Sequence, residues 1–159
     1  MTMTMDELMK VLDMQEDILQ FTHFTNADAW ELGTMILMEA RRRGAQVGIM
    51  IRRSNVEVVF QYCDNGITPH NVELMRRKSN SVLLTERSSL QLYMAATNAP
   101  ESVKQMVLDP KEYAMLGGGF PICVEEVGVV ATVAVSGMGQ VSDLSLIHIS
   151  EPTRQEAIS

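Results

Sequence analysis

The residue types best suited to bind an anion lie in two short runs. Arg76-Arg77-Lys78 stands in a segment of helical character, and Arg87 directly precedes Ser88-Ser89. Guanidinium and hydroxyl groups together could clamp a carboxylate or another small anion. Consecutive helix residues fan across about 200°, so the three cations of the first run cannot all face one ligand. A solvated helix face is therefore the alternative interpretation.

A run of three glycines before Phe120 and Pro121 is the most unusual stretch of the chain. Consecutive glycines let a backbone pass close to a ligand or to a neighbouring chain. The run lacks the Lys-Ser/Thr of a phosphate-binding loop, and the expected strand follows the glycines instead of preceding them as in a dinucleotide site. A tight loop that leads into an edge strand is the simpler interpretation.

A functional hypothesis joins the two features: the glycine loop approaches the cationic helix and forms a ligand pocket or a subunit contact with it. The backbone could come close there, beside cations that satisfy a carboxylate or carbonyl groups. The candidate ligand-binding or interface residues are Arg76, Arg77, Arg87, Gly117, Gly118, Gly119 and Phe120.

Other reactive side chains form no recognisable catalytic or metal-binding pattern. His23 and His70 have no metal-ligand spacing with each other or with Cys63 and Cys123. No nucleophile-elbow motif accompanies the serines. We therefore predict no metal, name no catalytic residue, and expect the cysteines to be reduced.

Composition restricts the partners of the chain. The net charge of −7 argues against a general nucleic-acid binder, because such proteins present a basic surface. No apolar run approaches the roughly 20 residues that cross a bilayer, and no signal-peptide pattern opens the chain. We expect a cytoplasmic protein with neither nucleic-acid nor membrane partners, whose 46 % hydrophobic content supports a true core.

The last residues of the chain resemble a translated sequencing adapter of the transposase type. The resemblance begins at Leu144 and is closest up to Arg154. Such segments are set aside when a fold is predicted. We predict one domain over residues 1–143, an artefact tail over residues 144–159, and the loss of a C-terminal helix by truncation after Asp143.

Local signals divide the remaining chain into helices and two hairpins. Thr4 and Glu7 have capping-box spacing, Asn26 is the expected N-cap of a second helix, and Gly44 suits that helix's C-terminal end. Thr68-Pro69 opens a third helical region that breaks near Glu86. The predicted helices cover residues 6–20, 26–43 and 69–98, and the predicted strands cover residues 47–53, 56–62, 120–125 and 128–135.

Two hairpins separated by helices predict an α+β domain, with an antiparallel sheet, helices packed on one of its faces, and the second hairpin beside the first. Periodicity selects one side of the second helix and alternate strand positions for the core. The predicted core residues are Trp30, Ile36, Ile49, Ile51, Val58, Phe60, Val133 and Val135.

Over residues 26–143 the chain resembles uncharacterised protein family 0303, a branch of the haem-degrading-domain superfamily. The stretches that carry the resemblance are Ala29–Gly33, Arg76–Lys78 with Asn80, Arg87–Ser89, Gly117–Pro121 and Val135–Gly137. The resemblance implies a profilin-like or PAS-like antiparallel sheet flanked by helices and a homo-oligomer. The wider superfamily includes haem-binding members. The resemblance implies no defined enzymatic activity for this branch.

Two histidines of the family pattern are missing here. Leu116 stands where the family usually has His before the glycines, and Leu144 follows Asp143 where a second His is expected. Haem remains a possible ligand by resemblance, but neither position supplies an iron ligand. Three functions stay open: a binding domain for a small, haem-related ligand, a non-catalytic homo-oligomeric interaction module, and an enzyme that acts on a small anion.

Overall fold

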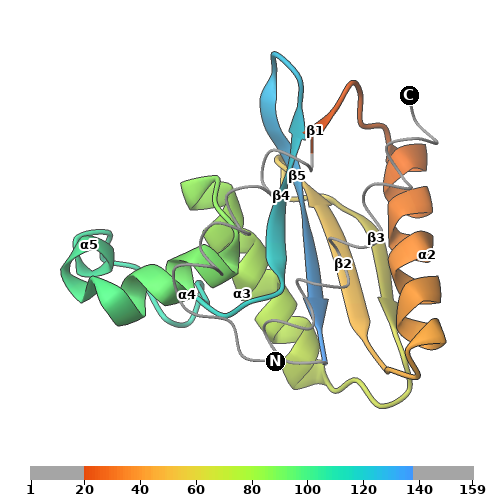
Figure 1. Cartoon of the computed structure of the whole chain (residues 1–159), viewed down its shortest axis with the longest axis horizontal. Coiled ribbons are helices and arrows are strands. Elements are labelled where there is room, and N and C mark those ends of the chain that lie inside the picture. The colour runs from red at the N-terminus through yellow and green to blue at the C-terminus, as the bar shows by residue number, and fades with distance from the viewer. Residues whose placement is uncertain (1–19, 138–159) are drawn as a thin grey trace.

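The computed structural model describes residues 20–137 (Figure 1). The predicted helix over residues 6–20 falls almost wholly outside this range, and its last residue, Gln20, lies in a strand instead. The segment after Gly137, with the predicted artefact tail, also lies outside the described residues.

The centre of the fold is a five-stranded sheet in the order β1-β4-β5-β2-β3. The two predicted hairpins are confirmed, and β5 pairs with β2 antiparallel, so the second hairpin lies beside the first. The short β1 pairs with β4 in parallel, which makes the sheet mixed. The strands are β1 (Gln20–Phe21), β2 (Gly48–Arg53), β3 (Val58–Cys63), β4 (Gly119–Val124) and β5 (Gly128–Ser136).

The helices cover both faces of the sheet (Figure 1). The prediction that they pack on one face only was therefore wrong. α2 packs on β2 and β3, whereas α3 packs on the opposite face against β5 and β4. The reason lies in β2, where Ile49 and Met50 are both buried although they point to opposite faces. The helices are α2 (Asn26–Arg42), α3 (Pro69–Thr85), α4 (Ser89–Asn98) and α5 (Pro100–Lys104).

Side-chain caps fix where the long helices begin. Thr25, not Asn26, is the N-cap of α2, and it shares a capping box with Asp28. The predicted cap of α3 is confirmed, since the Thr68 hydroxyl accepts from the backbone N–H of Asn71. α2 ends at Arg42, and the predicted Gly44 follows the C-cap residue Arg43 with a φ of +71°.

The larger core cluster joins α2 to one face of the sheet, and it includes most of the predicted core residues. Trp30 and Val58 are exceptions, because their exposed fractions are 61 % and 44 %. A smaller cluster of Met50, Met75 and Ala134 lies on the other face, beneath α3. This second face positions the site described next.

Candidate functional site

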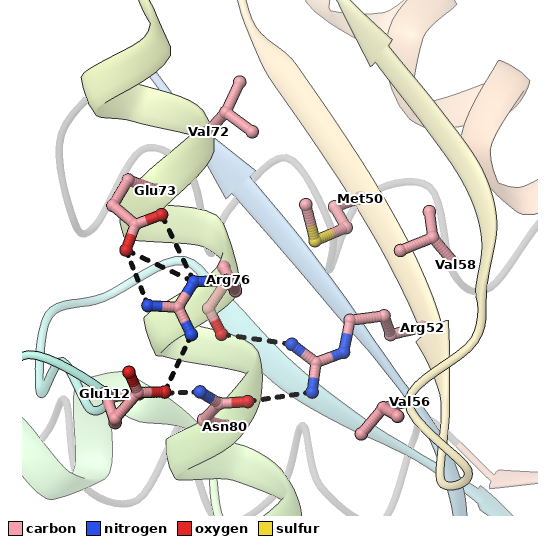
Figure 2. Close-up of a pocket in the computed structure, with 9 residues that line it drawn as sticks. All are labelled: Met50, Arg52, Val56, Val58, Val72, Glu73, Arg76, Asn80 and Glu112. Carbon is pink, nitrogen blue, oxygen red and sulfur yellow. Dashed lines mark hydrogen bonds and ion pairs between the residues drawn. The ribbon is translucent and has the colours of Figure 1, made fainter.

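An open cavity of about 400 Å³ lies between α3 and the neighbouring strands β2 and β3 (Figure 2). The sheet contributes apolar side chains and one guanidinium, α3 contributes polar groups and Val72, and Glu112 comes from the segment after α5. Its lining residues are Met50, Arg52, Val56, Val58, Val72, Glu73, Arg76, Asn80 and Glu112.

Arg52 is the central polar residue of this cavity. It alternates with Ile51 along β2, so its side chain projects toward α3, and the residue is only 5 % exposed. Its Nη1 donates to the carbonyl oxygen of Arg76 at 3.3 Å, and its Nη2 donates to Oδ1 of Asn80 at 2.8 Å (Figure 2). Both acceptors are neutral, so no carboxylate in residues 20–137 pairs with this buried cation.

Two further observations show that the hydrogen bonds and the positive charge of Arg52 are incompletely matched. Its Nε is buried and has no hydrogen-bond partner among the described residues. Burial lowers the pKa of the guanidinium, and the positive charge of Arg76 lowers it further. Native proteins pair nearly all buried polar groups, so an unmatched buried donor at a cavity suggests a missing partner.

Arg76, by contrast, is fully matched. Its guanidinium pairs with Glu73 at 2.6 Å on its own helix and with Glu112 at 2.9 Å in the segment that follows α5. Hydrogen bonds to these two carboxylates raise the pKa of Arg76. Asn80 ties the same segment to α3, because its Nδ2 donates to the Glu112 carbonyl at 2.7 Å.

The other predicted cations, Arg77, Lys78 and Arg87, point in different directions. The helical spacing of the first two required this. Arg77 is half-buried and donates to the carbonyl oxygen of Pro110 at 3.2 Å. Lys78 is buried and donates to the carbonyl oxygen of Val135 at 3.1 Å. Arg87 is exposed in the link between α3 and α4. Of the predicted site residues, only Arg76 lines the cavity.

The glycine segment does approach a neighbour closely, but that neighbour is the chain's own helices. The backbone N–H of Gly119 donates to the Ser89 hydroxyl at 2.8 Å. A Cβ at Gly119 would lie 3.0 Å from that oxygen and 3.2 Å from Cβ of Lys78. Gly119 is also the first residue of β4, and Phe120 is buried in the main core at 1 % exposure.

Arg52 was not among the predicted site residues. A signal was present in the sequence, because Gly48–Arg53 reads as a buried strand that nevertheless contains Arg52 at an interior position. Arg53 has a structural role instead, since it donates to the carbonyl oxygen of Phe24. Asn80 was noticed only through the family resemblance.

The described residues also limit the chemistry that the fold can perform. In residues 20–137 no cluster of three or more His, Cys, Asp or Glu side chains is placed to hold a metal ion. Cys63 and Cys123 form no disulfide in this part of the chain, and burial raises the pKa of Cys63. No helix in this part of the chain is long and apolar enough to cross a membrane.

Comparisons with known proteins place this geometry in a family. Residues 24–148 match the model of the HbpS-like haem degrading proteins. A UPF0303 protein of Streptomyces avermitilis is 41 % identical over 143 residues, with 86 % of this chain and 83 % of that protein covered. A UPF0303 protein of Pseudomonas entomophila is 38 % identical over 142 residues, with coverages of 89 % and 78 %.

Solved structures share the fold. The crystal structure of the Ybr137w protein superposes with a TM-score of 0.84 at 25 % identity, covering 94 % of this chain and 89 % of that one. A structure described as a complex of PduOC with heme superposes with a TM-score of 0.69 at 12 % identity, covering 81 % and 93 %. The second likeness shows a common fold alone.

Proposed function

Because this chain belongs to the HbpS-like haem degrading protein family, we propose that it is a binding domain for a small organic ligand with an anionic group. The ligand occupies the cavity between α3, β2 and β3. The observation that carries this proposal is Arg52, a buried cation that lines the cavity and has no carboxylate partner among residues 20–137.

The energetics favour an anion at this position. A buried charge is costly unless it is paired and hydrogen-bonded, and charge-assisted hydrogen bonds to a carboxylate are among the strongest that a guanidinium makes. The guanidinium has five N–H donors, of which the bonds to Arg76 and Asn80 use only part. The cavity volume falls within the range of about 300–1,000 Å³ that is usual for small-ligand sites.

The family description directs attention to haem, and the residues of the cavity fit only part of that group. Arg52 suits a carboxylate such as those that a porphyrin carries. Protein ligands to haem iron are His, Cys, Met or Tyr, and the lining contains only Met50 of these. Met50 is 4 % exposed and packs with Met75 and Ala134. The lining therefore fits porphyrin carboxylates but not the iron.

Titrations of the full chain with haemin and with iron-free protoporphyrin IX test the proposal, read by absorbance and by NMR shifts of the cavity residues. We expect similar affinities for the two compounds, shifts at Val58 and Val72, and weaker binding by Arg52→Met. Arg42→Met is the matched control, because Arg42 lies on α2 and pairs with Glu39. The proposal fails if neither a porphyrin nor a smaller aromatic carboxylate shifts the cavity residues, or if Arg52→Met binds like the wild type.

A second candidate function is a homo-oligomeric interaction module, and a surface of α2 favours it. Trp30 and Met38 lie two turns apart on one helix face, with exposed fractions of 61 % and 69 %. They stand on the helix that packs on β3, the edge strand of the sheet. Exposed aromatic and methionine side chains are enriched in subunit interfaces.

Mass in solution, measured by light scattering across a range of concentrations, tests this second function. Trp30→Glu combined with Met38→Glu should reduce the mass to that of a monomer, while Val127→Glu, at an exposed turn, serves as the control. The predicted roles of Arg77, Arg87 and the glycine segment stay predictions. Arg77→Ala and Gly118→Val, followed by the same mass and binding measurements, test them.

A further inference from the structure

The charges around the cavity are unevenly compensated. Two cations, Arg52 and Arg76, and two anions, Glu73 and Glu112, line it. The net charge of the lining is therefore zero, but the two negative charges are not shared evenly. Both glutamates pair with Arg76, and neither pairs with Arg52.

The hydrogen bonds of Arg76 leave it little capacity for a ligand. Its Nε and Nη2 donate to Glu73, its Nη1 donates to Glu112, and its Nη2 also donates to the carbonyl oxygen of Lys111. A second anionic group near Arg76 would compete with two carboxylates already in place, and like charges repel at such distances. Of the two cations in the described lining, Arg52 is the one with donors left for an incoming anion.

The remaining lining of the cavity is apolar. It consists of Met50 and Val58 on the sheet, Val72 on α3 and Val56 in the β2–β3 turn. Val56 is 64 % exposed, and its φ of +66° is a conformation that β-branched residues rarely adopt. Its side chain is thus held at the cavity in a conformation that costs energy, and an apolar ligand would cover it.

From this arrangement we propose that the cavity selects an apolar monocarboxylate. The single carboxylate binds Arg52, and the apolar body lies against Met50, Val56, Val58 and Val72. Neutral analogues lose the charge-assisted bond, and dianions gain nothing because Arg76 is occupied by Glu73 and Glu112. This inference rests on the proposed function and adds the class of ligand to it.

A matched series of naphthalene compounds tests the inference by calorimetry with the full chain. The probes are naphthalene-2-carboxylate, the neutral naphthalene-2-carboxamide and naphthalene-2,6-dicarboxylate. The wild type should bind the carboxylate about tenfold or more tightly than the carboxamide, the ratio expected from one charge-assisted hydrogen bond. The dicarboxylate should bind no more tightly than the monocarboxylate.

Three variants connect the selectivity to the residues. Arg52→Met should bring the carboxylate-to-carboxamide ratio close to one, whereas the control Arg42→Met should keep the wild-type ratio. Glu112→Gln removes one of the two charges on Arg76, and its side chain is half exposed, so folding should not suffer. In this variant the dicarboxylate should become the tighter ligand. Val56→Gly should raise the melting temperature but weaken binding of all three naphthalene probes.

The outcomes distinguish a failure of this inference from a failure of the proposed ligand-binding function. If the carboxamide binds the wild type as tightly as the carboxylate, or the dicarboxylate binds about tenfold more tightly, the monocarboxylate inference is overturned while ligand binding stands. The same holds if a porphyrin shifts the cavity residues and the naphthalene series does not bind. If no probe of either kind shifts the cavity residues, both the function and the inference fail.

Discussion

Gly33 of α2 lies directly over the ring of Phe60 on β3, so close that a Cβ at position 33 would collide with the ring atoms. Gly33 is buried and stands in the middle of the helix, where glycine is ordinarily unfavourable. The helix therefore accepts the cost of glycine in order to sit close to the sheet. This contact sets the distance between α2 and the edge strand.

Gly33→Ala should destabilise the protein by about 1–3 kcal/mol, because overpacking outweighs the gain of about 0.5–1 kcal/mol that alanine brings to a helix interior. Urea unfolding followed by circular dichroism measures the change. Phe60→Leu provides the control, since a smaller side chain gives the new methyl group room. In that background Gly33→Ala should cost much less, and an equal cost in both backgrounds would contradict the argument.

Local signals were enough to predict most helices and strands, but not which of their faces are buried. The α3 cap at Thr68, the break near Glu86 and both hairpins depend on a few neighbouring residues, and they are confirmed. Trp30 was wrongly assigned to the core, because a helical pattern does not reveal that Gly33 must meet the sheet. The second covered face was missed because only the alternate positions Ile49 and Ile51 of β2 were assigned to the core, while Met50 between them is buried as well.

The cavity was harder to predict than the fold, because its residues meet only through non-local contacts. Arg76 was selected from a cationic run, but one of its two glutamate partners, Glu112, is far away in the sequence. Arg52 gains its significance from the placement of α3 over β2, which brings it to Asn80. A buried strand that includes an arginine is the one local sign that pointed to this site.

Ile51→Ala should cost about 2–5 kcal/mol, since the side chain is fully buried in the main core between α2 and the sheet. Denaturant melts give the change in the free energy of unfolding. Val58→Ala on the neighbouring strand is the comparison, because Val58 is 44 % exposed and should lose less than 1 kcal/mol, roughly. A change below about 0.5 kcal/mol for Ile51→Ala would show that the position is not core.

Glu39, in the last turns of α2, gives a prediction about pH. Its hydrogen bond with Arg42, supported by Arg43, lowers the pKa of the carboxyl from 4.5 to about 2. A depressed folded-state pKa means that the stabilisation is complete above the unfolded value and is lost as the pH falls through the folded one. Wild type should therefore exceed Glu39→Gln in stability at pH 6, and the difference should disappear toward pH 2, roughly.

Carboxyl NMR titration of Glu39 checks the cause of that loss directly. Arg42→Gln removes the largest contribution, so the pKa of Glu39 should rise toward its ordinary value in this variant. Because the Arg42 side chain is exposed, salt should weaken the effect. An unchanged pKa in Arg42→Gln would contradict the assignment.

The strand register makes Arg52 and Thr132 cross-strand neighbours, and both carry a buried atom without a partner. Thr132 has an exposed fraction of 0 %, and its Oγ1 accepts and donates no hydrogen bond within the described residues. A buried hydroxyl in this state bears the cost of lost hydration without compensation. The hydroxyl of Ser81, also buried, differs because it bonds both the N–H and the carbonyl oxygen of Ala114.

Thr132→Val should leave the ligand-free protein as stable as the wild type or more stable, by up to about 1 kcal/mol, because valine fills the same space without a polar atom. Ser81→Ala should instead lose about 1–3 kcal/mol, since it removes the donor to the carbonyl oxygen of Ala114 and leaves the Ala114 N–H with only the longer bond to the carbonyl oxygen of Arg77, at 3.3 Å. Parallel urea melts compare the two variants with the wild type. A loss of more than about 1 kcal/mol for Thr132→Val would show that the Thr132 hydroxyl has a hydrogen-bond partner. That result would contradict the statement that polar atoms beside Arg52 are unpaired.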